Sequence, residues 1–141
     1  MESSSGKSNV IARFGPEGVD GLTISGHMDV VPTDGQEWTS DPFKLSRRDG
    51  RLYGRGSADM KGFLAATMAA LSEFPLSQLR RELALVWTHD EEVGCIGSGV
   101  LAERWNSNQR SLPVQTWIGE PTDARICRMH PGHCTIEIKA I

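Results

Sequence analysis

Residues 83–92 read Leu83-Ala84-Leu85-Val86-Trp87-Thr88-His89-Asp90-Glu91-Glu92, an apolar run of strand length that ends in acidic side chains. The run from Leu83 to Thr88 has the composition of a buried β-strand. The arrangement recurs in Leu22–Ser25 followed by His27 and Asp29, and in Val114–Ile118 followed by Glu120. Because ligands bind at the carboxyl ends of strands in open α/β sheets, this pattern predicts an α/β fold with a site at those ends.

The other elements are predicted from local signals. Val10–Phe14 has the pattern of a strand, and Asp49-Gly50 predicts a hairpin turn between residues 43–45 and 51–53. Small and apolar side chains predict a well-buried helix over Lys61–Phe74, which Pro75 ends, and a short helix near residues 98–105. Residues 124–128 and 135–141 alternate as the two strands of a hairpin do.

Composition limits the classes of function. A chain of 141 residues with 38% apolar and 23% charged residues has the composition of one globular domain. The net charge of −3 argues against nucleic acid or an anionic membrane as a partner. No apolar run is long enough to span a bilayer, and residues 1–9 lack the apolar segment of a secretory signal. Three cysteines, an odd number without framework spacing, favour a reducing, cytoplasmic location.

His27 and Asp29 stand two residues apart, so in extended backbone their side chains share one face. Asp29 could hold the second ring nitrogen of a metal-binding His27, although a polar pair in a surface loop has the same pattern. Asp59 precedes the predicted helix, and taken alone it is more typical of a helix N-cap. A dinucleotide-binding loop is excluded because it needs glycine at position 59.

Glu91 and Glu92 point in different directions in regular backbone, so one could bind a metal while the other serves as a general base. A solvated acidic turn is the alternative, and a solvated strand end is the alternative for Glu120. Two like charges beside a buried strand are nevertheless costly unless a cation neutralises them. The combination of all these strand-end residues therefore favours a metal site.

A second set of possible metal ligands, Cys127, His130, His133 and Cys134, has a spacing that matches no usual zinc module. His89 is expected to pack beside the site without binding metal. Cys95 is expected to be a small buried residue near the site. The four tryptophans are expected in the core or in a cleft wall; they are Trp38, Trp87, Trp105 and Trp117.

Six motifs occur in one order along the chain. They are Gly26-His27-Met28-Asp29-Val30-Val31-Pro32, residues 34–43, residues 50–56, Asp59-Met60-Lys61-Gly62-Phe63, Asp90-Glu91-Glu92-Val93-Gly94-Cys95 and Gly119-Glu120-Pro121-Thr122. In combination they resemble the two-zinc metallopeptidase and aminoacylase family, over residues 9–141. Segments 34–38 and 91–95 are most similar to family members that act on N-acetylornithine.

The resemblance implies a three-layer αβα catalytic domain with a mixed, mostly parallel sheet, followed by the first strands of a smaller α+β lid or dimerisation domain. It also implies roles for the site residues. His27 and Glu120 would bind one zinc ion and Glu92 the other, while Asp59 would bridge both through a cis peptide to Met60. Asp29 would orient His27, and Glu91 would be the general base and acid.

The activity implied by the resemblance is hydrolysis of an N-acyl amino acid, first of all N-acetylornithine to ornithine and acetate in arginine biosynthesis. The cofactor would be Zn²⁺, two per complete site, or Co²⁺. A desuccinylase acting on succinyl-diaminopimelate, a carboxypeptidase or a dipeptidase remains an alternative, as does an inactive metal-binding module. The expected partner is a small-molecule substrate, and the full-length parent would be a homodimer.

Chains of that family are much longer, and a histidine near their C-terminus completes the second zinc site. We therefore expect a partial chain, with a flexible polar segment over residues 1–8, a partial catalytic domain over 9–123 and the start of the lid domain over 124–141. The isolated polypeptide is expected to bind one metal near His27, Asp59 and Glu120 and to have little activity.

Overall fold

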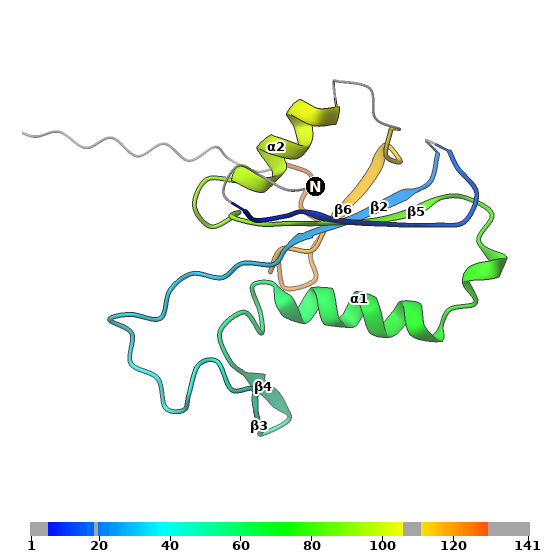
Figure 1. Cartoon of the computed structure of the whole chain (residues 1–141). Helices are drawn as coiled ribbons and strands as arrows, with labels where there is room; N and C mark the ends of the chain where they lie inside the picture. Colours follow the sequence, from blue (N-terminus) through cyan, green and yellow to red (C-terminus); the bar gives the residue numbers. More distant parts are fainter. Residues whose placement is uncertain (1–5, 19, 106–110, 130–141) are drawn as a thin grey trace, which may run out of the picture.

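The computed structural model describes residues 6–18, 20–105 and 111–129, and four strands among them form a central sheet (Figure 1). In spatial order these strands are β1 (Val10–Phe14), β5 (Leu83–Thr88), β2 (Leu22–His27) and β6 (Gln115–Ile118). Strands β5, β2 and β6 run parallel, and β1 is antiparallel to β5. The four strands of this sheet were each predicted from the sequence, although β2 extends two residues beyond its predicted end and β6 begins one residue after Val114.

The register places the carboxyl ends of the parallel strands at one edge of the sheet. His27 of β2 lies opposite Thr88 of β5, and Ser25 of β2 lies opposite Ile118 of β6. Beyond the strands, the backbone N–H of Met28 donates to the Thr88 carbonyl over 2.8 Å. The loops that begin at the ends of the three strands therefore start side by side.

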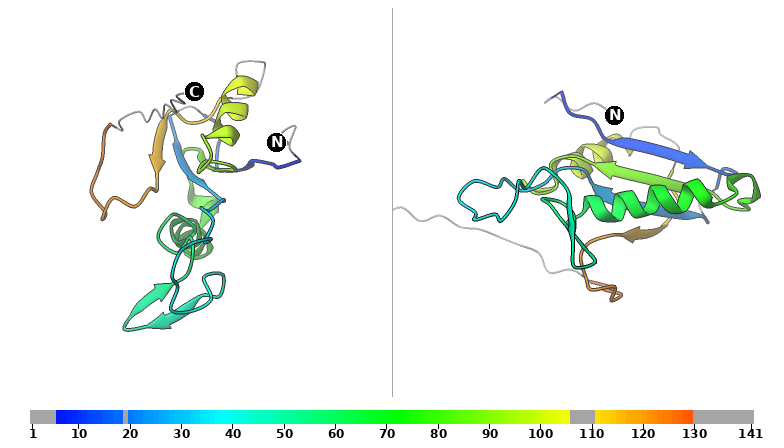
Figure 2. Two further views of the ribbon diagram at one scale, coloured as in Figure 1. Left: turned by 90° about the vertical axis from the view of Figure 1, so that its left-hand side faces the viewer. Right: turned by 90° about the horizontal axis from the view of Figure 1, so that it is seen from below.

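Helices α1 (Lys61–Glu73) and α2 (Ile96–Trp105) lie on opposite faces of this sheet (Figure 1, Figure 2). Consecutive residues of β5, Ala84, Leu85 and Val86, are all buried. A strand that is apolar on both faces is typical of an α/β sheet covered on both sides. The predicted α/β class, with three layers and a mixed, mostly parallel sheet, is confirmed.

The prediction of a well-buried helix over residues 61–74 was correct in its bounds but wrong in its burial. Within α1 only Leu64 and Thr67 are buried, and Met68 is 57% exposed. One stripe of the helix packs on the sheet, and in the described chain nothing covers the alanine-rich outer face. Small apolar side chains fit a buried helix and a one-sided helix equally well, so the sequence pattern could not separate the two.

The predicted hairpin is present, but its strands are β3 (Ser46–Arg48) and β4 (Arg51–Tyr53). The first strand lies closer to the turn than the predicted residues 43–45. Asp49 and Gly50 both have positive φ, at 50° and 72°, which makes a tight two-residue turn and pairs Arg48 directly with Arg51.

Residues 124–128 are not a strand, so that part of the second predicted hairpin was wrong. Asp123 and Ala124 have positive φ and form a turn, and Ile126 is 93% exposed without a paired neighbour among the described residues. Residues 135–141, the other predicted strand, lie outside the described residues.

The end of the sheet opposite His27 carries an apolar groove of about 550 Å³. It lies between the second half of α1 and the amino ends of the parallel strands, and its walls include Leu22, Leu71, Phe74 and Trp117. The short 3₁₀ turn η1 (Leu76–Gln78) precedes β5 beside this groove. Within the described ranges, no helix combines the length and the apolar character that a membrane span requires.

Candidate metal centre

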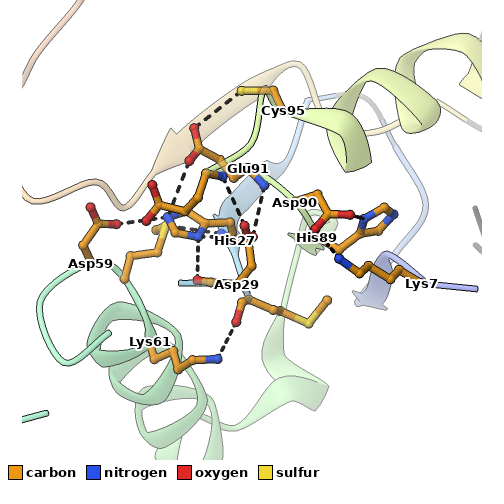
Figure 3. Close-up of polar contacts among 12 residues, drawn as sticks. Lys7, His27, Asp29, Asp59, Lys61, His89, Asp90, Glu91 and Cys95 are labelled. Atoms are coloured by element: carbon orange, nitrogen blue, oxygen red, sulfur yellow. Dashed lines mark hydrogen bonds and ion pairs between the residues drawn. The ribbon is translucent and has the colours of Figure 1, made fainter. Parts of the chain in front are cut away.

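The predicted site residues meet at the carboxyl edge of the sheet. Figure 3 shows His27, Asp29, Asp59 and Glu91 of this group. His27 is the last residue of β2, Glu91 and Glu92 come after β5, and Glu120 comes after β6. Asp59 belongs to the segment just before α1, which begins at Lys61. Residues that are up to 93 positions apart in the sequence are thus brought within reach of one ion.

Two overlapping sets of donor atoms could each hold a cation. One set is His27, Asp59 and Glu120, and the other is His27, Glu91 and Glu92. Within each set the ligand atoms lie within 4.8 Å of one another. One imidazole and several carboxylates are ligands that zinc accepts, so the donor chemistry fits this metal.

The imidazole of His27 is held on both sides. Its Nδ1 lies 3.0 Å from the backbone carbonyl oxygen of Asp29, and its Nε2 lies 3.0 Å from Oδ1 of Asp59. The side chain is 2% exposed. An Nδ1–H that donates to a carbonyl leaves Nε2 as the atom for a metal, which is the usual arrangement of a metal-binding histidine.

The electrostatics of the site favour a cation. Burial opposes a charged ring at His27, but the hydrogen bond to Asp59 and the charge of Glu120 outweigh it and raise the pKa of His27. Burial, and then the charge of Asp59, raise the pKa values of Glu92 and Glu120. These carboxylates resist ionisation because they are buried and because like charges crowd around them, and a metal ion would offset both effects.

Asp29 also lies in the site, with its carboxylate turned toward the loop after β5. Its Oδ1 accepts the backbone N–H of Glu91 and its Oδ2 accepts that of Glu92, each over 3.1 Å. Oδ1 is also 3.5 Å from Nδ1 of His27. Asp29 therefore connects the end of β2 with the end of β5.

The environment of Asp59 argues against the helix-cap interpretation. The residue at the N-cap position of α1 is Met60, and no side chain caps this end. The peptide between Asp59 and Met60 is cis, as the resemblance predicted. Met60 is fully buried, so it fixes Asp59 at the mouth of the site.

Close packing brings the end of β6 against α1. A Cβ atom on Gly119 would lie 2.1 Å from the ring of Phe63, so only glycine fits there. This contact places the neighbouring Glu120 beside the start of the helix and therefore beside Asp59.

Cys95 was predicted to be buried, but it is exposed. Its thiol donates to Oε1 of Glu91 over 3.5 Å, on a turn where the φ of Cys95 is 57°. The turn projects the residue outward, a feature that composition does not reveal. Cys127 is exposed and belongs to neither donor set, while His130, His133 and Cys134 lie outside the described residues.

A cluster that the sequence analysis missed lies behind the site. Nζ of Lys7 is 2.5 Å from Oδ1 of Asp90, whose Oδ2 is 3.1 Å from Nδ1 of His89. As predicted, His89 is buried beside the site. Lys7 stands in a polar segment without a pattern, so no sequence signal could have identified its contact.

Comparison with known proteins identifies related chains. Residues 23–140 match the sequence profile of peptidase family M20/M25/M40. Acetylornithine deacetylase of Pasteurella multocida (strain Pm70) is 41% identical over 133 residues, which are 94% of this chain and 34% of the relative. The chain thus spans about a third of the length of that relative.

Two solved structures have the same fold. Human carnosine dipeptidase 1 is 32% identical with a TM-score of 0.67, over 78% of this chain and 24% of that protein. An M20 family metallo-carboxypeptidase from Sulfolobus solfataricus is 26% identical with a TM-score of 0.65, over 84% of this chain and 27% of that protein.

Proposed function

The chain belongs to peptidase family M20/M25/M40, and from that membership we propose that it acts as a zinc-dependent amide hydrolase on N-acyl amino acids. The convergence of His27, Asp59, Glu91, Glu92 and Glu120 at one sheet edge carries this proposal. N-acetylornithine is the first candidate substrate, because a deacetylase named for it is 41% identical.

In this proposal the residues divide into ligands and a proton carrier. His27, Asp59, Glu92 and Glu120 hold up to two zinc ions, which supply a Lewis acid for the amide carbonyl and for water. Glu91 is the proton carrier, the role that the family resemblance implies, and its Oε2 lies 4.0 Å from Nε2 of His27.

The reaction needs one proton moved across the site. Glu91 accepts a proton from water as oxygen adds to the acyl carbon, and it returns this proton to the nitrogen as the C–N bond breaks. The products are a carboxylic acid and a free amine. The backbone N–H of Glu91 donates to Oδ1 of Asp29 over 3.1 Å.

Titration of zinc into the metal-free chain tests the metal site. We expect saturable binding that His27→Ala abolishes and that Glu91→Gln preserves, because the amide keeps the size of the side chain. Zinc binding that survives His27→Ala would contradict the proposed ligand set. A large loss of affinity in Glu91→Gln would make Glu91 a ligand, as the second donor set allows.

Release of amine from zinc-loaded chain tests the chemistry. N-acetylornithine should be cleaved faster than N-succinyl-diaminopimelate or dipeptides, and Glu91→Gln should abolish cleavage. A peptidase is the second candidate, because the similar solved structures are a dipeptidase and a carboxypeptidase. Zinc binding without turnover of any substrate would favour the inactive metal-binding module.

A further inference from the structure

Asp29 has two separate sets of contacts, one through its backbone and one through its side chain. Its backbone carbonyl accepts from Nδ1 of His27 over 3.0 Å. Its carboxylate oxygens each accept a different backbone N–H, from Glu91 and from Glu92, over 3.1 Å. The distance from Oδ1 to the His27 ring, 3.5 Å, is longer than any of these contacts.

The segment that Asp29 contacts is a tight turn with little regular structure of its own. Asp90, just before the two glutamates, has φ of 53°, and Cys95, just after the turn, has φ of 57°. The N–H groups of Gly94 and Cys95 both donate to the carbonyl of Glu91 and so close the turn. The N–H groups of Glu91 and Glu92 point the other way, toward β2, where the Asp29 carboxylate accepts them.

We propose that the Asp29 carboxylate is a positioning group for Glu91 and Glu92, and that His27 is oriented chiefly by the backbone carbonyl of Asp29. Hydrogen bonds from N–H donors to an ionised carboxylate are about twice as strong as neutral ones. Two such bonds fix both position and rotation of the Glu91–Glu92 peptide. The consequence for hydrolysis rests on the function proposed above, whereas the positioning itself does not.

The charge distribution agrees with this role. Asp29 belongs to neither set of metal donors, although four carboxylates of the site do. Both oxygens of its carboxylate accept backbone N–H groups. It therefore stabilises the loop without competing with the ligands for the metal.

The test uses ¹⁵N-labelled chain with Asp29→Asn and Asp29→Ala. Asparagine keeps the shape of the side chain and one acceptor oxygen, so the resonance of one of the two amide protons, of Glu91 or Glu92, should move upfield. Alanine removes both acceptors, so both resonances should move upfield. The His27 ring should keep its proton on Nδ1 in both variants, because the carbonyl remains. Asp41→Asn is the matched control, since its Oδ1 accepts the N–H of Phe43 in an exposed loop and should leave Glu91 and Glu92 unchanged.

Zinc affinity gives a second readout, independent of turnover. Groups that orient metal ligands typically change affinity about 10- to 100-fold when removed. We expect Asp29→Ala to lower the zinc affinity by a factor within that range. The affinity of Asp29→Asn should lie between those of Asp29→Ala and the unmodified chain. If the amide protons shift and no zinc binds to any form, the positioning role stands and the proposed function fails. If the amides stay and the His27 ring changes tautomer, the positioning role is wrong.

Discussion

The two inner strands and the edge strand β6 supply residues to the same site from different surroundings. In β5 the side chains of Ala84, Leu85, Val86 and Thr88 are buried, whereas every residue of β6 is exposed. Strands β2 and β5 are paired on both sides, but β6 has β2 as its one paired neighbour among the described strands. His27, Glu91 and Glu92 are thus fixed by core packing and by Asp29, while Glu120 depends on one strand pairing and on the Gly119–Phe63 contact.

The largest effect should come from a cavity in the inner strands. Leu85 is 5% exposed, so Leu85→Ala should lower the free energy of unfolding by about 3 kcal/mol. The control is Ile118→Ala on β6, which is 66% exposed and should cost less than about 1 kcal/mol. Urea denaturation followed by circular dichroism measures both. Equal losses of unfolding free energy in the two variants would mean that β6 is as well packed as β5, and the difference between the two strands would not hold.

The next effect compares Glu120, which follows the edge strand β6, with Asp59, a ligand from the segment just before α1. Asp59→Asn should weaken zinc binding by about 100-fold, the upper end of the range for groups that only orient ligands. Glu120→Gln should weaken it by about 10-fold, because an exposed edge strand holds its ligand less rigidly. Competition with a chelator of known affinity measures both. A greater loss from Glu120→Gln would show that β6 is the better organised side.

The strands and the ligand cluster could be predicted because each depends on a local pattern. An apolar run such as Leu83–Thr88 defines a strand, and parallel strands bring the residues after their carboxyl ends to one edge of the sheet. The helix bounds and the Asp49-Gly50 turn could also be predicted, because they too depend on local patterns. The cis peptide at Asp59 came from the resemblance, since nothing in the residues alone requires it.

The features that were missed depend on long-range packing. The exposure of α1 and of Cys95 depends on which surfaces the rest of the chain covers. Composition does not predict this. The bonds from Asp29 to the Glu91 and Glu92 amides join residues 62 and 63 positions apart and involve backbone atoms, which have no residue signature. The turn at Asp123 replaced a predicted strand because alternation alone does not provide a pairing partner.

Without metal, the stability of the chain should depend on pH through His27, the last residue of the inner strand β2. The pKa of His27 is raised, so the folded chain holds this proton more tightly than the unfolded chain. The contribution to the free energy of unfolding is complete below about pH 6.5 and is lost as the pH rises through the folded-state pKa. Urea denaturation in EDTA across that range should show the decline, and His27→Gln should flatten it. Equal slopes in both forms would exclude His27 as the source.

The smallest effect should come from Lys7, which forms an ion pair with Asp90 in the loop after β5. Lys7 is 56% exposed and pairs with Asp90, so Lys7→Met should cost under about 1 kcal/mol of stability, and the cost should shrink in high salt. Lys7 and His89 lower the pKa of Asp90, so the cost should also fade as the pH falls and this carboxylate is protonated.

Zinc affinity decides whether this ion pair matters to the site. Asp90 directly precedes Glu91, but the Asp29 carboxylate already fixes the peptides of both glutamates. Lys7→Met should therefore leave zinc affinity within about twofold of the unmodified chain, well below the loss expected for Asp29→Ala. Lys44→Met in the exposed loop is the charge-matched control. A loss in Lys7→Met as large as that in Asp29→Ala would mean that the loop is held from both sides, and that the rigidity of the β5 end depends on the N-terminal segment as much as on β2.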